Sequence, residues 1–134
     1  MAFVDQLSVP GVPKVIDPAK HAMLDYGVAA TYFVMGAKLL SQRRAAGILA
    51  FINGGMVLGM SLFTDYPGGI WRRISFPTHG ALDVAQAALA GVGPLLMGFG
   101  DSDEAKFFYG QAISEASVIS ATDWHAQERV AQAA

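Results

Sequence analysis

The chain has 134 residues, of which 53% are hydrophobic and only 15% are charged, and its formal net charge is −2. This length allows one domain, and the composition is far from that of a typical soluble protein. The slightly negative charge offers no basic surface for nucleic acid, and the absence of cysteine excludes disulfides, thiolate metal sites and cysteine nucleophiles.

Four apolar stretches follow one another along the chain, at residues 23–40, 45–63, 81–99 and 107–121. Each approaches the roughly 20 residues that a helix needs to cross a hydrocarbon core. The second contains only Asn53 and Ser61 as polar side chains, too few for the water-facing side of a helix in a soluble helical protein. We therefore expect an all-α fold, an integral membrane four-helix bundle made of two tandem helical hairpins.

Start signals and connectors divide this single membrane domain into parts. Asp17 before a proline predicts the start of the first helix, and Ser75 or Thr78 beside Pro77 predicts the start of the third. We expect an N-terminal arm at 1–16, a first hairpin at 17–66, an interfacial loop at 67–77, a second hairpin at 78–124 and a frayed helical tail at 125–134. The arm lacks the basic start of a secretory signal, and its two prolines favour an extended segment along the membrane surface or over a neighbouring subunit.

An internal repeat relates the two hairpins, because residues 20–66 and 78–124 align without a gap at an offset of 58 residues. The matched positions are those least expected in a membrane helix. Each unit reads H-x-x-L-D near its start and T-D-aromatic at its end. The identical pairs include His21 with His79, Leu24 with Leu82, Asp25 with Asp83, Thr64 with Thr122, and Asp65 with Asp123.

These motifs resemble the SPW-repeat family of small bacterial and archaeal multi-pass membrane proteins. The resemblance covers most of the chain and includes "FPTHGALD" at the start of the second unit. The name-giving Ser-Pro-Trp is absent, since the corresponding stretch reads "GPLLMGF" at residues 93–99. The resemblance implies a two-helix repeat in a multi-pass membrane protein and brings no established activity.

The repeated ionisable residues are the candidate functional site. A hairpin returns the chain to its starting surface, so we expect His21, Asp25 and Asp65 to meet at one level, and His79, Asp83 and Asp123 to do the same in the second unit. Two His–Asp clasps that pin the hairpins are the leading interpretation. The same residues could instead bind a divalent metal, or the histidine pair could hold a haem or chlorin, but no motif assigns a metal or a cofactor.

Three further polar residues fall within the apolar stretches, namely Asn53, Gln111 and Glu115. A carboxylate at mid-membrane depth is costly and indicates function by default. A hydrogen bond between Glu115 and a serine or amide of another helix is the simpler interpretation, and a proton or ion path is the alternative.

Surface features predict self-association. Gly54 and Gly55 permit close helix approach, while Trp71, Arg72 and Arg73 suit the headgroup region. No catalytic motif or phosphate loop is present, so we expect a non-enzymatic protein with a structural or assembly role. A subunit of a larger membrane complex, a metal or haem binder and a small transporter are the alternatives. The expected partner is the lipid bilayer, in the bacterial inner membrane, with both termini on the cytoplasmic side.

Overall fold

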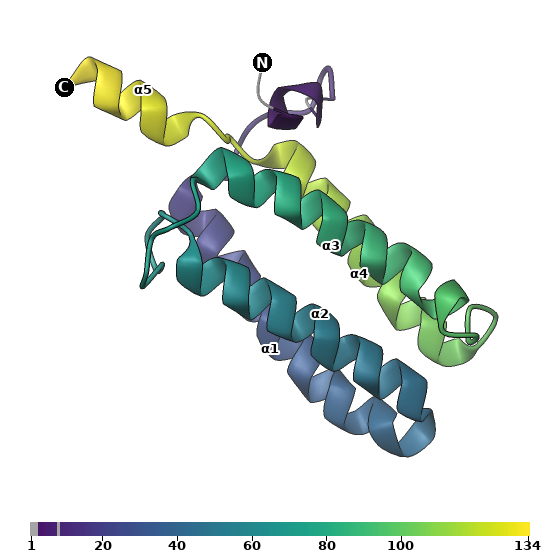
Figure 1. The fold of residues 1–134 in the computed structure, drawn as a ribbon. Helices are drawn as coiled ribbons and strands as arrows, with labels where there is room; N and C mark the ends of the chain where they lie inside the picture. Colours follow the sequence, from purple (N-terminus) through teal and green to yellow (C-terminus); the bar gives the residue numbers. More distant parts are fainter. Residues whose placement is uncertain (1–2, 8) are drawn as a thin grey trace.

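The computed structural model describes residues 3–7 and 9–134 and is all-helical over these residues, as predicted (Figure 1). Four long helices are followed by a short one. Their bounds are α1 Pro18–Gln42, α2 Arg44–Phe63, α3 Phe76–Leu96, α4 Asp103–Ala121 and α5 Ala126–Ala133. A short 3-10 helix, η1, precedes them at Phe3–Leu7.

The predicted helix starts are confirmed by their caps. The Asp17 side chain accepts a hydrogen bond from the Lys20 backbone N–H, and Pro18 occupies the first helical position. Ser75 caps α3 by accepting from the Thr78 N–H, so the serine rather than the threonine is the cap. Each cap satisfies a backbone donor that would otherwise lack a partner at the helix end.

Two helix ends differ from the expected stretches. α3 stops at Leu96 instead of residue 99, because Pro94 in its last turn is followed by Gly98 in the left-handed conformation, with φ 75°. Phe99 then turns back into the core. α4 begins at Asp103, four residues before its apolar stretch, where the Ser102 side chain accepts from the Ala105 N–H.

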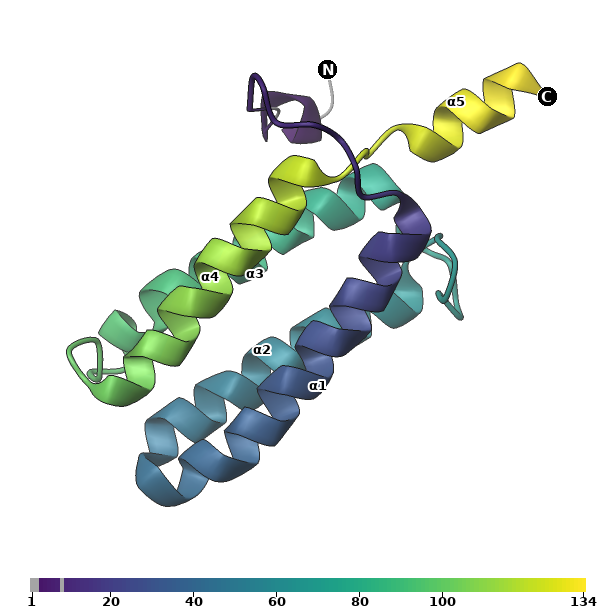
Figure 2. The ribbon, with the colours of Figure 1, turned by 180° about the vertical axis from the view of Figure 1, so that it is seen from behind.

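α1 and α2 form an antiparallel hairpin with an unusually tight connection, since only Arg43 separates them. Gly47 permits this turn. A Cβ at Gly47 would lie 2.7 Å from the Cα of Leu40, so any larger residue would collide with the backbone of α1. α3 and α4 form the second hairpin, and the two hairpins lie side by side (Figures 1 and 2).

Apolar packing is divided between the two ends of the molecule. One buried cluster includes Tyr32, Leu49, Phe99 and Phe108, near the short hairpin connections. The other, at the end that carries both termini, comprises Val4, Ala22, Tyr66, Phe76, Ala87, Ile119 and Trp124. The second cluster encloses the candidate site, because its aromatic rings pack around the histidines.

The predicted N-terminal arm folds onto its own chain, apart from residues 1, 2 and 8, which lie outside the described residues. Val4 of η1 is buried against α3, close to Gly80. Ile16 is extended and exchanges backbone hydrogen bonds with the end of α4, donating to Ala121 and accepting from Asp123. These residues pack against their own chain, and their contact with the membrane surface or with a neighbouring subunit stays a prediction.

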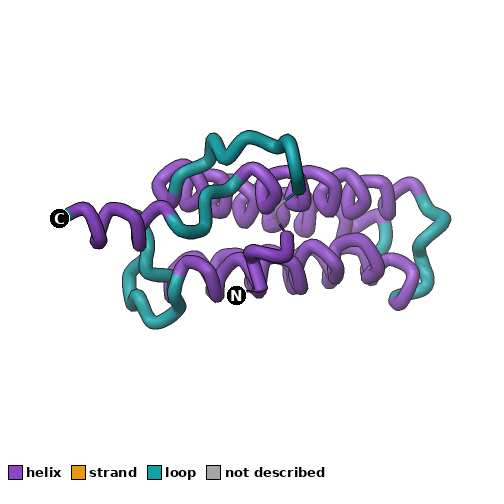
Figure 3. Tube along the Cα trace, turned by 90° about the horizontal axis from the view of Figure 1, so that it is seen from above, coloured by secondary structure: helices purple, strands orange, loops and turns teal. Residues whose placement is uncertain are grey.

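The C-terminal tail is helical, as expected. α5 has no buried residue and points away from the four long helices (Figures 1 and 3). Arg129 pairs with Asp123, and His125 at the start of α5 contacts Asp5 of η1 at 2.6 Å. These polar contacts connect the two terminal segments.

One helix in the described part of the chain, α2, satisfies the length and hydropathy expected of a membrane-spanning helix. The sequence predicts four membrane-spanning helices, and one of the four meets these criteria. The other long helices carry the inward-facing polar residues of the candidate site and of a second polar network, and these residues lower their mean hydropathy.

Candidate functional site

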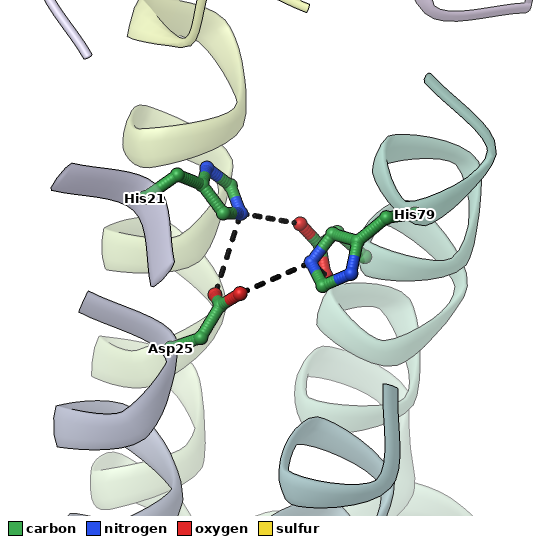
Figure 4. A group of neighbouring side chains, drawn as sticks. His21, Asp25 and His79 are labelled. Carbon is green, nitrogen blue, oxygen red and sulfur yellow. Dashed lines mark hydrogen bonds and ion pairs between the residues drawn. The ribbon is translucent and has the colours of Figure 1, made fainter. Parts of the chain in front are cut away.

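Four ionisable side chains from α1 and α3 converge between the two hairpins (Figure 4). Because residues four apart share one helix face, His21 lies over Asp25 on α1, and His79 lies over Asp83 on α3. Nε2 of His21 is 3.3 Å from Asp25 and 3.0 Å from Asp83. Nε2 of His79 is 3.1 Å from an oxygen of each aspartate. The four residues form a closed set of alternating His and Asp, which we call the His–Asp ring.

The His–Asp ring is almost completely shielded from solvent. Both histidines are 0% exposed, and Asp25 and Asp83 are 7% and 8% exposed. Trp124 and Phe76 lie against the His21 ring at centroid distances of 4.9 and 5.4 Å. Buried ionised groups require compensation by partners, so the ring must balance its charges internally or with a bound ion.

Two threonines fix the orientation of both imidazoles. Nδ1 of His79 lies 2.7 Å from Oγ1 of Thr64, and Nδ1 of His21 lies 2.9 Å from Oγ1 of Thr122. Each threonine hydroxyl already donates its single proton to the carbonyl four residues earlier in its own helix. The hydroxyl must therefore accept from the histidine, which places a proton on both Nδ1 atoms.

The inner nitrogens, Nε2, consequently face the carboxylates with either a second proton or a lone pair. Nε2 of His21 is placed to hydrogen-bond with Asp83. Nε2 of His79 makes no hydrogen bond among the described residues, although two carboxylate oxygens are 3.1 Å away. The nitrogen thus points between the oxygens rather than at either one. Tyr66 donates its hydroxyl proton to Asp25 over 2.8 Å and holds that carboxylate in place.

The contacts of the two units are exchanged across the repeat. His21 of the first unit binds Thr122 of the second, while His79 of the second binds Thr64 of the first. The backbone follows the same rule, since the Asp123 N–H donates to the Ile16 carbonyl and the Asp65 N–H donates to the Ile74 carbonyl, each member 58 residues from its counterpart. The His–Asp pairs predicted within each unit are present, at 3.3 Å for His21 with Asp25 and 3.1 Å for His79 with Asp83, but contacts across the units join them into one ring.

Asp65 and Asp123 do not join the ring. The chain leaves the helix after Thr64 and Thr122, so the threonine side chains face inward and the next residues turn outward. Asp65 is exposed and lies 3.6 Å from Arg72. Asp123 pairs with Arg129, which holds the pKa of this carboxyl below its usual range. In each repeated T-D pair, the threonine rather than the aspartate contacts the ring. The prediction considered charged residues and therefore did not include the threonines.

A second polar network lies deeper between the helices. Oε1 of Glu115 accepts from the Tyr32 hydroxyl at 2.8 Å and from the Gln86 amide at 3.4 Å, and that amide also donates to Asn53 at 2.8 Å. The predicted contact of Glu115 with an amide is thus present. Gln111 is half-buried and is not among the members of this network in the described residues.

Tyr32 and Gln86 were not predicted because neither is repeated at the offset of 58. A signal was available for Gln86, which lies one turn after Asp83 on the inward face of α3. The repeat directed attention to matched residues, whereas this network joins residues that the two units do not share.

A small cavity separates the His–Asp ring from this network. Its volume is about 30 Å³, and His21, Asp25, Asp83, Gln86 and Glu115 contribute to its walls. Such a volume accommodates a water molecule or two. Oε2 of Glu115 is buried and has no hydrogen-bond partner among the described residues. The two histidine rings are only 5.3 Å apart and nearly perpendicular, so a haem or chlorin does not fit between them.

The residues predicted for the interface and for self-association have separate roles. Gly54 is buried, and a Cβ there would lie 3.0 Å from Tyr32 of α1, whereas a Cβ on Gly55 would meet nothing within 4 Å in the described chain. Trp71 is exposed and stacks on Phe63 at 4.9 Å. Arg72 and Arg73 are exposed beside it. Gly54 therefore serves hairpin packing, and only Gly55 faces outward.

Together these features define an all-helical protein whose two hairpins meet at a buried ring of two histidines and two aspartates. No protein-family model matches the chain, and no curated protein and no solved structure matches it either.

Proposed function

We propose that this chain is a multi-pass integral membrane protein with a structural, non-enzymatic role, folded as a four-helix bundle that the His–Asp ring holds together. The observation that carries the proposal is the apolar outer surface of the four long helices. Large apolar side chains that are more than a third exposed occur on every one of them: Met23, Leu24, Val34, Leu40, Ile48, Phe51, Ile52, Phe63, Leu82, Val92, Leu95, Leu96 and Ile113. Water would make such a surface adhesive, whereas lipid would solvate it.

The lengths of the helices and the placement of charge support this environment. The four helices have 25, 20, 21 and 19 residues, which correspond to about 28–38 Å at 1.5 Å per residue. The charged residues of the ring and Glu115 face inward, and the exposed Lys38 lies four residues before the end of α1. On α4, Ser117 and Ser120 donate to carbonyls of their own helix, which reduces the cost of hydroxyls near lipid.

The chemistry of one end of the bundle supports an orientation with both termini on the same side. The loop between α2 and α3 carries Trp71 stacked on Phe63, with Arg72 and Arg73 beside it. Aromatic and basic side chains of this kind are enriched at the membrane–water interface. The termini are at this same end (Figure 1), and the cytoplasmic side of the bacterial inner membrane remains our proposal for it.

The reciprocal contacts of the two units support an internal repeat and a place in the SPW-repeat family. Each hairpin supplies one aspartate to its own histidine, and the second aspartate and the threonine come from the other hairpin. A single hairpin would lack the second aspartate and the threonine that contact its histidine, so the ring is complete only when both hairpins are present. A transporter is less well supported, because the cavity beside the ring has only about 30 Å³.

Self-association through the outward face of α2 belongs to the same proposal, with a subunit of a larger membrane complex as its alternative. Gly55 and Gly59 are four residues apart, and a Cβ on either would meet no atom within 4 Å in the described chain. This spacing permits close approach of a second helix in lipid. Phe51 and Ile52 lie exposed on the preceding turn.

Membrane fractionation and cysteine labelling test the proposal. The chain has no cysteine, so single cysteines at Asp101, Trp71 and Gln132 report position uniquely. We expect extraction by detergent but not by alkaline carbonate, with Trp71→Cys and Gln132→Cys labelled from one side and Asp101→Cys from the other. A folded protein in the soluble fraction, or labelling of all three positions from one side, would contradict it.

A lower native mass in lipid nanodiscs for Gly55→Leu than for Gly110→Leu would support self-association, and an unchanged mass would remove it.

A further inference from the structure

One nitrogen of the His–Asp ring lies within ion-pair distance of two carboxylates without a well-directed hydrogen bond to either. Nε2 of His79 is fully buried and aimed into the ring, yet it makes no hydrogen bond in the described part of the chain. A proton on Nε2 would point between the two carboxylate oxygens, each of which is 3.1 Å away. The same direction is ideal for a lone pair that coordinates an ion placed at the centre of the ring.

The spacing of the ring is close to that of metal ligands, although its contacts use both oxygens of each carboxylate. Zinc binds histidine nitrogen and carboxylate oxygen at about 2.0–2.2 Å, so neighbouring ligand atoms around a tetrahedral ion lie roughly 3.3–3.5 Å apart. The four His–Asp distances are 3.0, 3.1, 3.1 and 3.3 Å, and each aspartate directs one oxygen at His21 and its other oxygen at His79. One candidate ligand atom from each residue lies within 4.8 Å of every other. A rotation of each carboxylate that brings one oxygen toward both Nε2 atoms would therefore give the spacing of metal ligands.

The threonines prepare the imidazoles for this role. Because Thr64 and Thr122 accept the Nδ1 protons, the neutral imidazoles carry their lone pairs on Nε2, the atom that faces inward. Metal-bound histidines commonly have their other ring N–H held in this way. The Tyr66 hydroxyl likewise orients the carboxylate of Asp25 by donating a hydrogen bond to it.

We propose that His21, Asp25, His79 and Asp83 bind one divalent first-row transition-metal ion of zinc-like size with two nitrogen and two oxygen ligands. Two carboxylates neutralise the charge of the ion, so the complex is neutral, as burial between apolar helices requires. Nitrogen and oxygen ligands in a tetrahedron suit zinc, and the absence of thiolates disfavours copper(I). Four protein ligands make the site structural, with an ion that joins α1 to α3. The inference rests on the proposed role of the ring in joining the two hairpins.

Metal binding to the purified, tag-free protein tests the inference. Chelator-treated protein in detergent is titrated with Zn²⁺ by calorimetry, and Co²⁺ is added separately as a spectroscopic probe. We expect one Zn²⁺ per chain and the strong visible absorption of four-coordinate Co²⁺. Asp83→Asn should lower Zn²⁺ affinity at least 100-fold. Asp65→Asn and His125→Gln, which change the same residue types outside the ring, should leave affinity within about twofold of the wild type.

Thr64→Val is the second test variant, for use if Asp83→Asn does not fold. It keeps all four proposed ligands and removes the hydroxyl that accepts a hydrogen bond from Nδ1 of His79. We expect a 10–100-fold loss of Zn²⁺ affinity with helical circular dichroism unchanged. A folded wild type that binds no stoichiometric Zn²⁺, Co²⁺ absorption typical of six water-like ligands, or equal affinity in Thr64→Val and the wild type would overturn the inference. Membrane extraction is measured on the same samples, so failure of the metal site is distinguished from failure of the proposed membrane role.

Discussion

Nε2 of His21 lies 3.0 Å from Oδ2 of Asp83, a residue 62 positions later on another helical hairpin. This contact, with its counterpart between His79 and Asp25 at 3.1 Å, joins α1 to α3 at the end of the molecule that carries both termini. Each histidine also pairs with the aspartate of its own helix, but its second aspartate belongs to the other hairpin, so the stability of each hairpin depends on the presence of the other.

Replacing one member of the ring should therefore destabilise the whole protein. For Asp83→Asn we expect a loss of about 3–5 kcal/mol, because removing one partner of a buried pair leaves the other uncompensated. Thermal unfolding in detergent, followed by circular dichroism, measures this loss. Asp123→Asn is the matched control, since its partner Arg129 is exposed and surface pairs contribute only about 0–1 kcal/mol. Equal effects of the two changes would show that the ring is energetically unimportant.

Glu115 offers a comparison between keeping and removing a buried acceptor. Its Oε1 accepts from Tyr32 and Gln86, whereas its Oε2 has no partner in the described residues. Glu115→Gln retains an acceptor oxygen and should be neutral or stabilising. Glu115→Leu leaves the buried donors unpaired and should cost about 1–3 kcal/mol. Denaturant titration in mixed micelles compares the two variants, and a Gln variant as unstable as the Leu variant would contradict the assignment and indicate a role for the charge itself.

The tight turn between α1 and α2 should depend on Gly47. Gly47→Ala introduces a methyl group 2.7 Å from the Leu40 Cα, so we expect destabilisation of about 1–3 kcal/mol from overpacking. At Gly55 the added methyl meets nothing, and the higher helix propensity of alanine should stabilise the protein by up to about 1 kcal/mol. Melting temperatures of the two variants should thus shift in opposite directions, and a shared direction would show that the close approach at Gly47 is relaxed in solution.

Contact between the terminal segments should weaken as pH rises. Glu128 and then Asp5 raise the pKa of His125, and the neighbouring Asp123 carboxylate acts in the same sense. Because the folded pKa is the higher one, this contribution is complete below the ordinary histidine pKa of about 6.5 and is lost as pH rises through the raised value. Hydrogen exchange of residues 3–7 should accelerate across that range beyond the intrinsic rate. His125→Gln should remove the extra acceleration, and its persistence would assign the effect to another group.

Local sequence features determined the helices of this protein. Apolar stretches, the Asp17 and Ser75 caps and the prolines fix where the four long helices lie, because these signals act within a turn or two of chain. The spacing of four between His21 and Asp25 also fixed that both side chains share one face of α1, and the offset of 58 showed that α3 presents the same pair.

Only the tertiary structure decided that the two pairs form one ring. The rotation and separation of the hairpins depend on packing between residues far apart in the chain, such as Val4 against α3 and Leu49 beside Gly93, and helical periodicity carries no information about that packing. The same limit explains why Thr64 and Thr122, rather than the following aspartates, hold the histidines: a side chain's direction where a helix ends is set by the path of the chain beyond it. Charge and repetition marked the candidate residues, while the distances between helices determined which of them meet.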